Sequence, residues 1–172
     1  MPILDRLVSG LFGRRIDILV RRAVASELAR RGSLPDGKAL LYHHLVHGDA
    51  SRLHIDPTAV VNDALFNLSS GDVTVGPYAF FGHHVAVLTG THDITTFGRD
   101  RQTAIPKSGR DVVIGQGAWL ASHVLVLGPC SIGPHAVVAA GSLVLRDVEP
   151  YTVVAGRPAR LVRRIEPPGS SA

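Results

Sequence analysis

His92 is the side chain in this sequence best suited to acid–base chemistry. It lies in residues 88–93, which read Leu-Thr-Gly-Thr-His-Asp. A neutral imidazole has a pKa near physiological pH, so it can accept a proton from a hydroxyl group and later return one. A solvated loop histidine is the alternative, and position alone does not separate the two. Asp93 follows directly and could orient an acceptor or the imidazole, or it could cap the loop.

A six-residue repeat indicates the elements that must position His92. A large apolar residue, usually aliphatic, returns every six positions, and a lane of smaller residues lies four positions after it in the sequence. The first lane holds Val75, Phe81, Val87, Ile114, Leu120, Val126, Ile132, Val138 and Val144, and the second holds Ala79, Val85, Ala118, Val124, Cys130, Ala136 and Ser142.

This period fits neither a continuous helix, which repeats about every 3.6 residues, nor an ordinary strand, which repeats about every 2. It predicts short strands joined by tight corners, with one long and one small side chain pointing inward from each strand. Stacked rungs then bury a continuous aliphatic column, and each rung is supported mainly by its neighbours. Aromatic residues make up only 5% of the chain and hydrophobic residues 45%, which suits such narrow layers. We therefore predict an all-β fold.

Two interruptions of the repeat predict irregular segments. Val87 and Ile114 are 27 positions apart, which is not a multiple of six, so we expect an extruded loop within residues 89–111. Its glycine, proline and charged residues are typical of a surface loop. Ile55 and Val61 are out of phase with Val75 by two residues, which predicts a bulge or turn near residues 67–71.

The ends of the chain differ from the repeat. Apolar residues of the segment 16–29 form one stripe at helical spacing, so residues 1–36 are predicted to be an N-terminal amphipathic helical segment. It would pack on the repeat domain or on a neighbouring subunit, and a membrane-surface anchor is the less favoured alternative. The repeat domain is expected at 37–165, and residues 166–172 are predicted to be a disordered tail.

Charge and cysteine content exclude several classes of function. The formal net charge is +4, but aromatic residues do not interleave with the arginine clusters, as stacking on single-stranded nucleic acid requires. A small anionic ligand is the better expectation, and no nucleic-acid partner is predicted. The single Cys130 excludes an intrachain disulfide, and no signal peptide or membrane-spanning stretch is apparent, which together predict a cytoplasmic protein.

Three segments in the same order resemble a known family. They are residues 89–93 (Thr-Gly-Thr-His-Asp), 112–121 (Val-Val-Ile-Gly-Gln-Gly-Ala-Trp-Leu-Ala) and 153–160 (Val-Val-Ala-Gly-Arg-Pro-Ala-Arg). Together they resemble the hexapeptide-repeat acyltransferases, in particular the colanic acid, maltose and nodulation-factor O-acetyltransferases. The resemblance covers residues 55–165 and implies a left-handed parallel β-helix, a homotrimer and acetyl-coenzyme A, or another acyl-coenzyme A, as co-substrate. It implies transfer to a hydroxyl of a sugar or glycoconjugate, as in polysaccharide biosynthesis.

The resemblance also assigns roles to individual residues. His92 would be the general base. Asn67 would help to hold the substrate or intermediate, although it could equally be a turn residue, and Asp93 would orient the acceptor or the imidazole. Backbone N–H groups near residues 119–122 are candidates to stabilise an oxyanion. Departing from the pattern, Arg157 stands where many relatives have asparagine. The implied coenzyme A-binding residues are Trp119, Ala121, Ser122, Ala139, Ala140, Gly141, Arg146, Arg157, Pro158, Arg160, Arg163 and Arg164.

Two further classes of function stay open. Carbonic anhydrases of the same β-helical fold bind zinc through three histidines, two of them five residues apart, but no pair of the nine histidines here has that spacing. No metal site is therefore predicted. A catalytically inactive β-helical scaffold is the other alternative, and the intact Thr-His-Asp run disfavours it. No cysteine or serine lies where a covalent acyl-enzyme would require one, so direct transfer in a ternary complex is expected.

Overall fold

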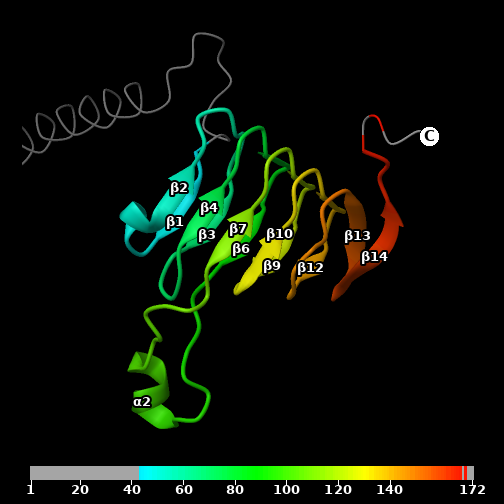
Figure 1. Cartoon of the computed structure of the whole chain (residues 1–172). Helices are drawn as coiled ribbons and strands as arrows, with labels where there is room; N and C mark the ends of the chain where they lie inside the picture. Colours follow the sequence, from blue (N-terminus) through cyan, green and yellow to red (C-terminus); the bar gives the residue numbers. More distant parts are fainter. Residues whose placement is uncertain (1–42, 168, 170–172) are drawn as a thin grey trace, which may run out of the picture. The chain divides into compact units, whose positions relative to one another are not determined.

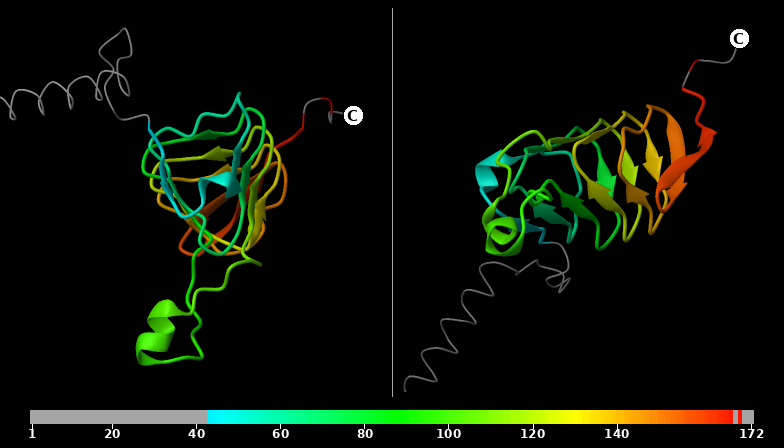
Figure 2. Two further views of the ribbon diagram at one scale, coloured as in Figure 1. Left: turned by 90° about the vertical axis from the view of Figure 1, so that its left-hand side faces the viewer. Right: turned by 90° about the horizontal axis from the view of Figure 1, so that it is seen from below.

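The computed structural model describes residues 43–167 and residue 169 (Figure 1). The predicted N-terminal helical segment, 1–36, and most of the predicted tail lie outside the described residues. Short strands dominate, and they wind around a common axis (Figure 2). Within residues 43–167 the helical elements are a 3₁₀ turn, η1 (Ala50–Arg52), and an α-helix, α2 (Gly98–Thr103).

The strands form three sheets, which we name A, B and C. Sheet A contains β1 (Leu45–His47), β3 (Leu65–Asn67), β6 (Ala86–Leu88), β9 (Leu125–Leu127) and β12 (Leu143–Val144). Sheet B contains β2 (Leu53–Ile55), β4 (Val73–Val75), β7 (Val112–Ile114) and β10 (Cys130–Ile132). Sheet C contains β5 (Phe80–Phe81), β8 (Trp119–Leu120), β11 (Val137–Val138), β13 (Thr152–Gly156) and β14 (Ala159–Arg164).

The chain passes through the sheets in the repeating order B, C, A, so each circuit is one coil of a parallel β-helix. All strand pairs are parallel except β13 and β14, which form an antiparallel hairpin at the C-terminal end. A regular coil takes 18 residues, as the pairing of Ile114 with Ile132 shows. The period of six read from the sequence is therefore one side of a three-sided coil.

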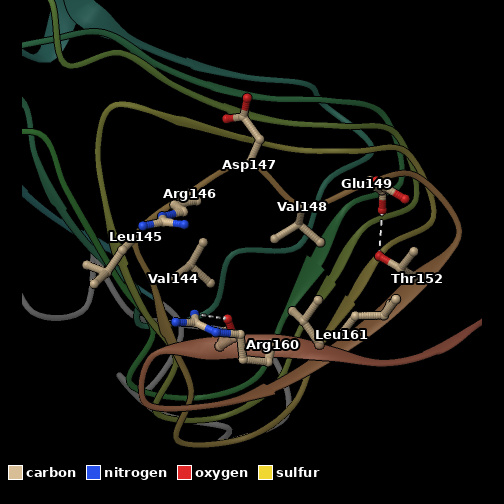
Figure 3. A pocket seen from close by; sticks show the side chains of 11 residues that line it. Val144, Leu145, Arg146, Asp147, Val148, Glu149, Thr152, Arg160 and Leu161 are labelled. Atoms are coloured by element: carbon tan, nitrogen blue, oxygen red, sulfur yellow. Dashed lines mark hydrogen bonds between the residues drawn. The ribbon is translucent and has the colours of Figure 1, made fainter.

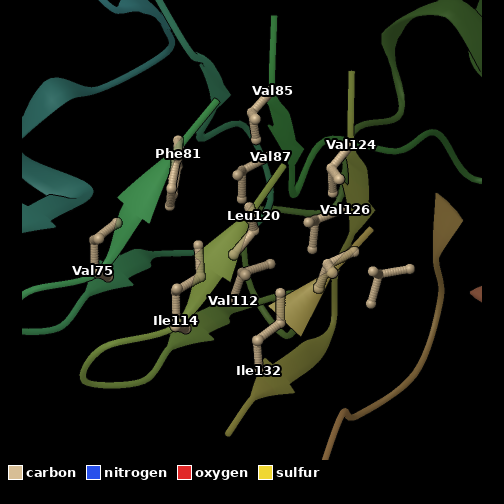
Figure 4. Packing of buried hydrophobic residues seen from close by; sticks show 14 of the residues in the cluster. Val75, Phe81, Val85, Val87, Val112, Ile114, Leu120, Val124, Val126 and Ile132 are labelled. Atoms are coloured by element: carbon tan, nitrogen blue, oxygen red, sulfur yellow. The ribbon is translucent and has the colours of Figure 1, made fainter. Parts of the chain in front are cut away.

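Both predicted lanes point into the coil, and every residue in them is buried (Figure 4). Each buried Val, Leu or Ile side chain contributes about 1.5–3 kcal/mol relative to exposure, so the column is the main source of stability. Cys130 belongs to the same column as a free thiol. Burial, assisted by the charge of Asp147, raises the pKa of Cys130 to about 11.

The two interruptions of the repeat lie where the phase of the sequence indicates. Ile55 pairs with Val75, 20 residues later, which is two more than a regular coil requires. The extra residues lie after β3, where Leu68 and Ser70 turn inward and are buried. Val75 pairs with Ile114, 39 residues later, so the coil that holds the loop is 21 residues longer than a regular one.

The corners between sheets matter for function, and we name two of them by the sheets they join. The C–A corner comprises residues 62–64, 82–84, 121–123 and 139–141, and the turn at 157–158 lies against its last part. The A–B corner comprises residues 68–72, 89–111, 128–129 and 145–147. Successive coils approach closely at the C–A corner: a Cβ on Gly82 would lie 2.5 Å from the backbone nitrogen of Ser122.

Candidate functional site

The loop 89–111 leaves the coil at the A–B corner, between β6 and β7, and carries α2 at its far end (Figures 1 and 2). Its root is fixed by Thr89, whose side chain is buried. The Thr89 hydroxyl donates to the Asn67 carbonyl at 2.8 Å and accepts from the Ser70 N–H at 3.2 Å. Arg110 closes the other end by donating from Nε to the Thr89 carbonyl at 2.8 Å. The loop therefore starts and ends on a rigid base.

His92 is exposed, but its ring is held in place. Its Nδ1 lies 2.8 Å from the main-chain carbonyl oxygen of Arg101 in α2. A carbonyl oxygen can only accept, so Nδ1 must carry the proton of this hydrogen bond. In the neutral ring the other nitrogen, Nε2, is then unprotonated and can accept a proton from a ligand. This arrangement suits a general base whose ring is oriented by a main-chain carbonyl of α2.

Asp93 has a different role from the base. Its carboxylate accepts from the Thr95 hydroxyl at 2.6 Å and from the Thr95 N–H at 2.8 Å. These bonds, the hydroxyl bond first, lower the pKa of Asp93. The Asp93 N–H donates to the Ala104 carbonyl at 2.9 Å, which ties the start of the loop to the end of α2. These contacts are those expected of a carboxylate that caps the loop. The catalytic role of Asp93 stays a prediction.

Asn67 lies at the end of β3, beside the root of the loop. Its side-chain oxygen accepts from the Ser69 N–H at 3.0 Å, two residues later, which is the geometry of a turn-forming asparagine. Its amide also packs against Gly90, where a Cβ would lie 2.5 Å from the Asn67 side-chain oxygen. Asn67 thus supports the segment that leads to His92.

The first part of the implied coenzyme A path lies on the outer face of sheet C and at the C–A corner. Trp119 is exposed and stacks on Phe80 of the preceding coil, with ring centroids 5.6 Å apart. The N–H groups of Trp119 and Ala121 donate to the next coil. The N–H of Ser122 makes no hydrogen bond within the residues that the structure describes, so it is the available donor in this stretch.

The next coil supplies the rest of this path. Ala139, Ala140 and Gly141 follow Ser122 one coil further on, and the Gly141 N–H donates to the Ser122 carbonyl at 2.9 Å. Arg157 joins them, because its Nε donates to the Gly141 carbonyl at 2.6 Å, and Pro158 follows it in the turn between β13 and β14. Small side chains and one arginine therefore lie together at this corner.

The remaining arginines do not gather around Arg157. Arg163 and Arg164 lie opposite Val153 and Thr152, at the other end of β13, and Arg164 pairs with Glu149 at 2.8 Å. Their proximity to Arg157 in the sequence is misleading because the β13–β14 hairpin reverses the chain direction between them. The structure therefore separates the arginines that the sequence suggested as one phosphate-binding group.

Arg146 and Arg160 line a pocket of about 240 Å³ at the C-terminal end of the coil (Figure 3). Its apolar wall includes Val144 and Val154, which are buried at the end of the inward-facing column, and Leu161 of β14. The pocket includes residues 145–147, which are the last part of the A–B corner and lie two coils after the loop that carries His92.

A cluster that sequence reasoning missed lies at the C–A corner. Asp63 accepts from the backbone N–H of His84 at 3.0 Å, and its carboxylate oxygens lie 3.0 Å from Nδ1 of His84 and 3.2 Å from Nδ1 of His83. The His84 ring lies 5.1 Å from that of His123, one coil later. Burial raises the pKa of Asp63, but the bonds from His84, from its own backbone and from His83 outweigh it, so the pKa is lowered.

The only feature of the sequence that could have predicted this cluster is that Asp63 and His84 are one coil apart. That coil is irregular in length, so the relation becomes apparent only in the structure. No group of three or more His, Cys, Asp or Glu residues in the described part of the chain is arranged to hold a metal ion. The described residues also include no helix long and apolar enough to cross a membrane.

His92 and the coenzyme A path lie at different corners of the same chain. His92 belongs to the A–B corner, whereas Ser122, Gly141 and Arg157 lie at the C–A corner, and sheet A separates the two. A single chain therefore does not bring His92 together with the residues predicted to bind coenzyme A.

Comparison with known proteins agrees with this architecture. Residues 111–146 match the family model described as bacterial transferase hexapeptide (six repeats). The chain is 40% identical over 114 residues to serine acetyltransferase 2 of Arabidopsis thaliana, covering 66% of this chain and 33% of that protein. It is 35% identical over 105 residues to a galactoside O-acetyltransferase of Lactococcus lactis subsp. lactis, covering 59% and 49%. The chain thus spans about a third to a half of the length of these relatives.

A solved structure shares the fold. The hexapeptide-repeat acetyltransferase of Vibrio cholerae O1 biovar eltor, crystallised with acetyl-coenzyme A, aligns with a TM-score of 0.51 and 26% identity over 74% of this chain and 73% of that chain. The predicted resemblance to hexapeptide-repeat acetyltransferases is confirmed, and it implies the left-handed winding of the coil.

Proposed function

We propose that this protein is an acyl-coenzyme A-dependent O-acyltransferase, most simply an O-acetyltransferase, with His92 as the general base. The observation that carries the proposal is the hydrogen bond from His92 Nδ1 to the Arg101 carbonyl, which leaves Nε2 able to accept a proton. General-base assistance of this kind contributes about 10²–10⁴-fold to a rate.

The reaction follows from this arrangement. Nε2 of His92 takes the proton of the acceptor hydroxyl as the oxygen attacks the thioester carbonyl. The resulting oxyanion accepts a hydrogen bond from the Ser122 N–H of the half-site at the C–A corner. When the intermediate collapses, the carbon–sulfur bond breaks and the leaving sulfur takes the proton back from His92. The acyl group moves directly, since burial and the raised pKa of Cys130 disfavour its thiolate.

The C–A corner is proposed as the coenzyme A side of the site. Residues 139–141 offer an extended ligand chain close access to backbone groups, and Arg157 at the same corner can pair with a phosphate. The similarity to an acetyltransferase solved with acetyl-coenzyme A supports this assignment. Arg163 and Arg164 are outside the proposed path because the β13–β14 hairpin directs them to the opposite corner.

A homotrimer would join the two half-sites. The outer face of sheet A is apolar along Leu65, Leu125 and Leu143, and that of sheet C is apolar along Phe80, Trp119 and Val137. By contrast, the outer lane of sheet B is mainly polar, as it holds His54, Thr74, Val113 and Ser131. Rotation about an axis parallel to the coil keeps each residue at its own height. His92 of one copy can then meet Ser122 of the next.

The acceptor proposed is a hydroxyl of a sugar or glycoconjugate, in a cytoplasmic reaction of polysaccharide biosynthesis. A galactoside O-acetyltransferase among the relatives supports a sugar, while a serine acetyltransferase shows that an amino acid hydroxyl is the competing class. An acceptor panel with acetyl-coenzyme A, read by release of free thiol, separates the two classes.

The test of the base is His92→Ala, with His54→Ala as the matched control because His54 lies exposed on the outer face of sheet B. We expect acceptor-dependent thiol release to fall at least 10²-fold in His92→Ala and to stay within twofold of the original in His54→Ala. Retained activity in His92→Ala would exclude His92 as the base.

Co-expression of two inactive chains tests the shared site. His92→Ala removes the base, and Ala140→Trp blocks the proposed coenzyme A path at the exposed C–A corner. If the half-sites come from different copies, mixed oligomers contain intact junctions and recover part of the activity. Mixed oligomers without any recovery would show that each site lies within one chain.

A further inference from the structure

The side chain of Arg101 is exposed, yet it makes three contacts within the loop. Its Nε donates to the Thr96 carbonyl at 2.7 Å, and its Nη2 donates to the Ile94 carbonyl at 3.2 Å. The guanidinium carbon lies 4.6 Å from the centre of the Phe97 ring. The side chain of Arg101 therefore fastens residues 94–97, which follow His92, against α2.

The main chain of the same residue holds the base. The last four carbonyl groups of an α-helix have no donor within the helix, and α2 ends at Thr103. The Ala104 N–H supplies a donor to Asp100, and the Ile105 N–H to Thr103. The Arg101 carbonyl receives Nδ1–H of His92 instead. The ring of His92 thus takes the place of a missing backbone donor at the end of the helix.

We propose that Arg101 is the positioning residue of His92. Its guanidinium fixes the turn 94–97 to α2, and this fixes the Arg101 carbonyl at the one place where it can hold Nδ1–H and leave Nε2 unprotonated. The inference extends the proposed function, in which His92 is the base, but the fixed ring is a property of the free protein and can be tested without any acceptor.

The planar guanidinium is suited to this role. It donates to two carbonyls in one plane and stacks on an aromatic ring at the same time, whereas the ammonium of lysine is a compact point charge. Arg101→Ala removes all three contacts. Arg101→Lys keeps the positive charge but loses the planar pair of N–H donors. Arg99→Ala is the matched control, since Arg99 lies on the same short helix, is exposed, and its side chain makes no hydrogen bond or ion pair within the described residues.

The decisive measurement is the ¹⁵N chemical shift of the two ring nitrogens of His92 in the unliganded protein, at a pH where the ring is neutral. The resonance is assigned by its absence in His92→Gln. We expect a protonated Nδ1 and an unprotonated Nε2 in the original protein and in Arg99→Ala. In Arg101→Ala the ring should shift toward the opposite tautomer, which a free imidazole prefers, with Arg101→Lys in between.

Activity gives the second readout. A displaced reactive group can lower a rate by roughly 10²-fold, so we expect kcat of Arg101→Ala to fall about 10- to 100-fold, with little change in KM for the acyl donor. An unchanged His92 tautomer in Arg101→Ala overturns the inference, whatever the activity. A shifted tautomer with full activity supports the positioning role and instead removes His92 from the proposed mechanism. A shifted tautomer with lowered kcat supports both.

Discussion

The coil and the loop 89–111 are held together by different kinds of contact. In the coil, each inward side chain packs against its equivalents one coil above and below, and the backbone ladder repeats the same pairing. In the loop, order rests on a few individual bonds at Thr89, His92, Asp93 and Arg101. The order of the coil is therefore spread over many equivalent contacts, whereas the order of the loop depends on a few individual bonds. Stability and chemistry should respond to different substitutions.

The largest effect expected from this difference is on unfolding. Ile114→Ala deletes buried methyl groups from a fully enclosed part of the column, so the free energy of unfolding should fall by about 2–5 kcal/mol. Phe97→Ala removes a larger side chain from the exposed loop and should change it by less than about 0.5 kcal/mol. Urea titration of both variants measures this. Equal losses would contradict the division between coil and loop.

A smaller effect is expected where coil and loop meet. Gly90→Ala places a Cβ against the Asn67 amide, which must rotate and release the Ser69 N–H, so we expect a loss of about 1–2 kcal/mol. In an Asn67→Ala background the space is already free, and the same substitution should have little further effect. A double-mutant cycle of unfolding free energies measures the coupling. Additive losses would mean that Asn67 and Gly90 do not depend on one another.

The same difference explains what the sequence could predict. The lanes through Ile114 and Val124, the bulge after Asn67 and the extent of the loop follow from a period, because a period is enforced by identical contacts in every coil. The bond between His92 and Arg101 has no such signature, since it depends on where a six-residue helix happens to end. The sequence predicted that these residues belong to a polar surface loop, but it did not predict that one of their carbonyl groups would orient His92.

The arginines near the C-terminus show the same limit. They are close in the sequence and were therefore grouped, but the turn after Gly156 reverses the chain and sends Arg164 to Glu149. The pairing of Asp63 with His84 was hidden for a related reason. The coil between them is irregular, so residues 21 apart face one another where a regular coil would place those 18 apart.

The smallest effect expected concerns two carboxylates whose pKa values are both lowered. The Asp63 carboxylate bonds to the next coil, at His84 and His83, whereas the Asp93 carboxylate bonds within the loop, to Thr95, two residues away. A lowered pKa means that the ionised form stabilises the fold above the unfolded value of about 3.9, and that this contribution is lost as the pH falls through the folded pKa.

Protonation of Asp63 should therefore weaken the contact between coils, while protonation of Asp93 should loosen only the loop. In Asp63→Asn we expect the stability difference from the original protein, of order 1 kcal/mol or less near neutral pH, to shrink as the pH is lowered toward about 3. Asp93→Asn should show no such pH-dependent difference in global unfolding. Thermal unfolding of both variants between about pH 6 and pH 3 measures this. If Asp93→Asn changed the acid dependence as much as Asp63→Asn, the loop would have to be part of the cooperative fold of the coil.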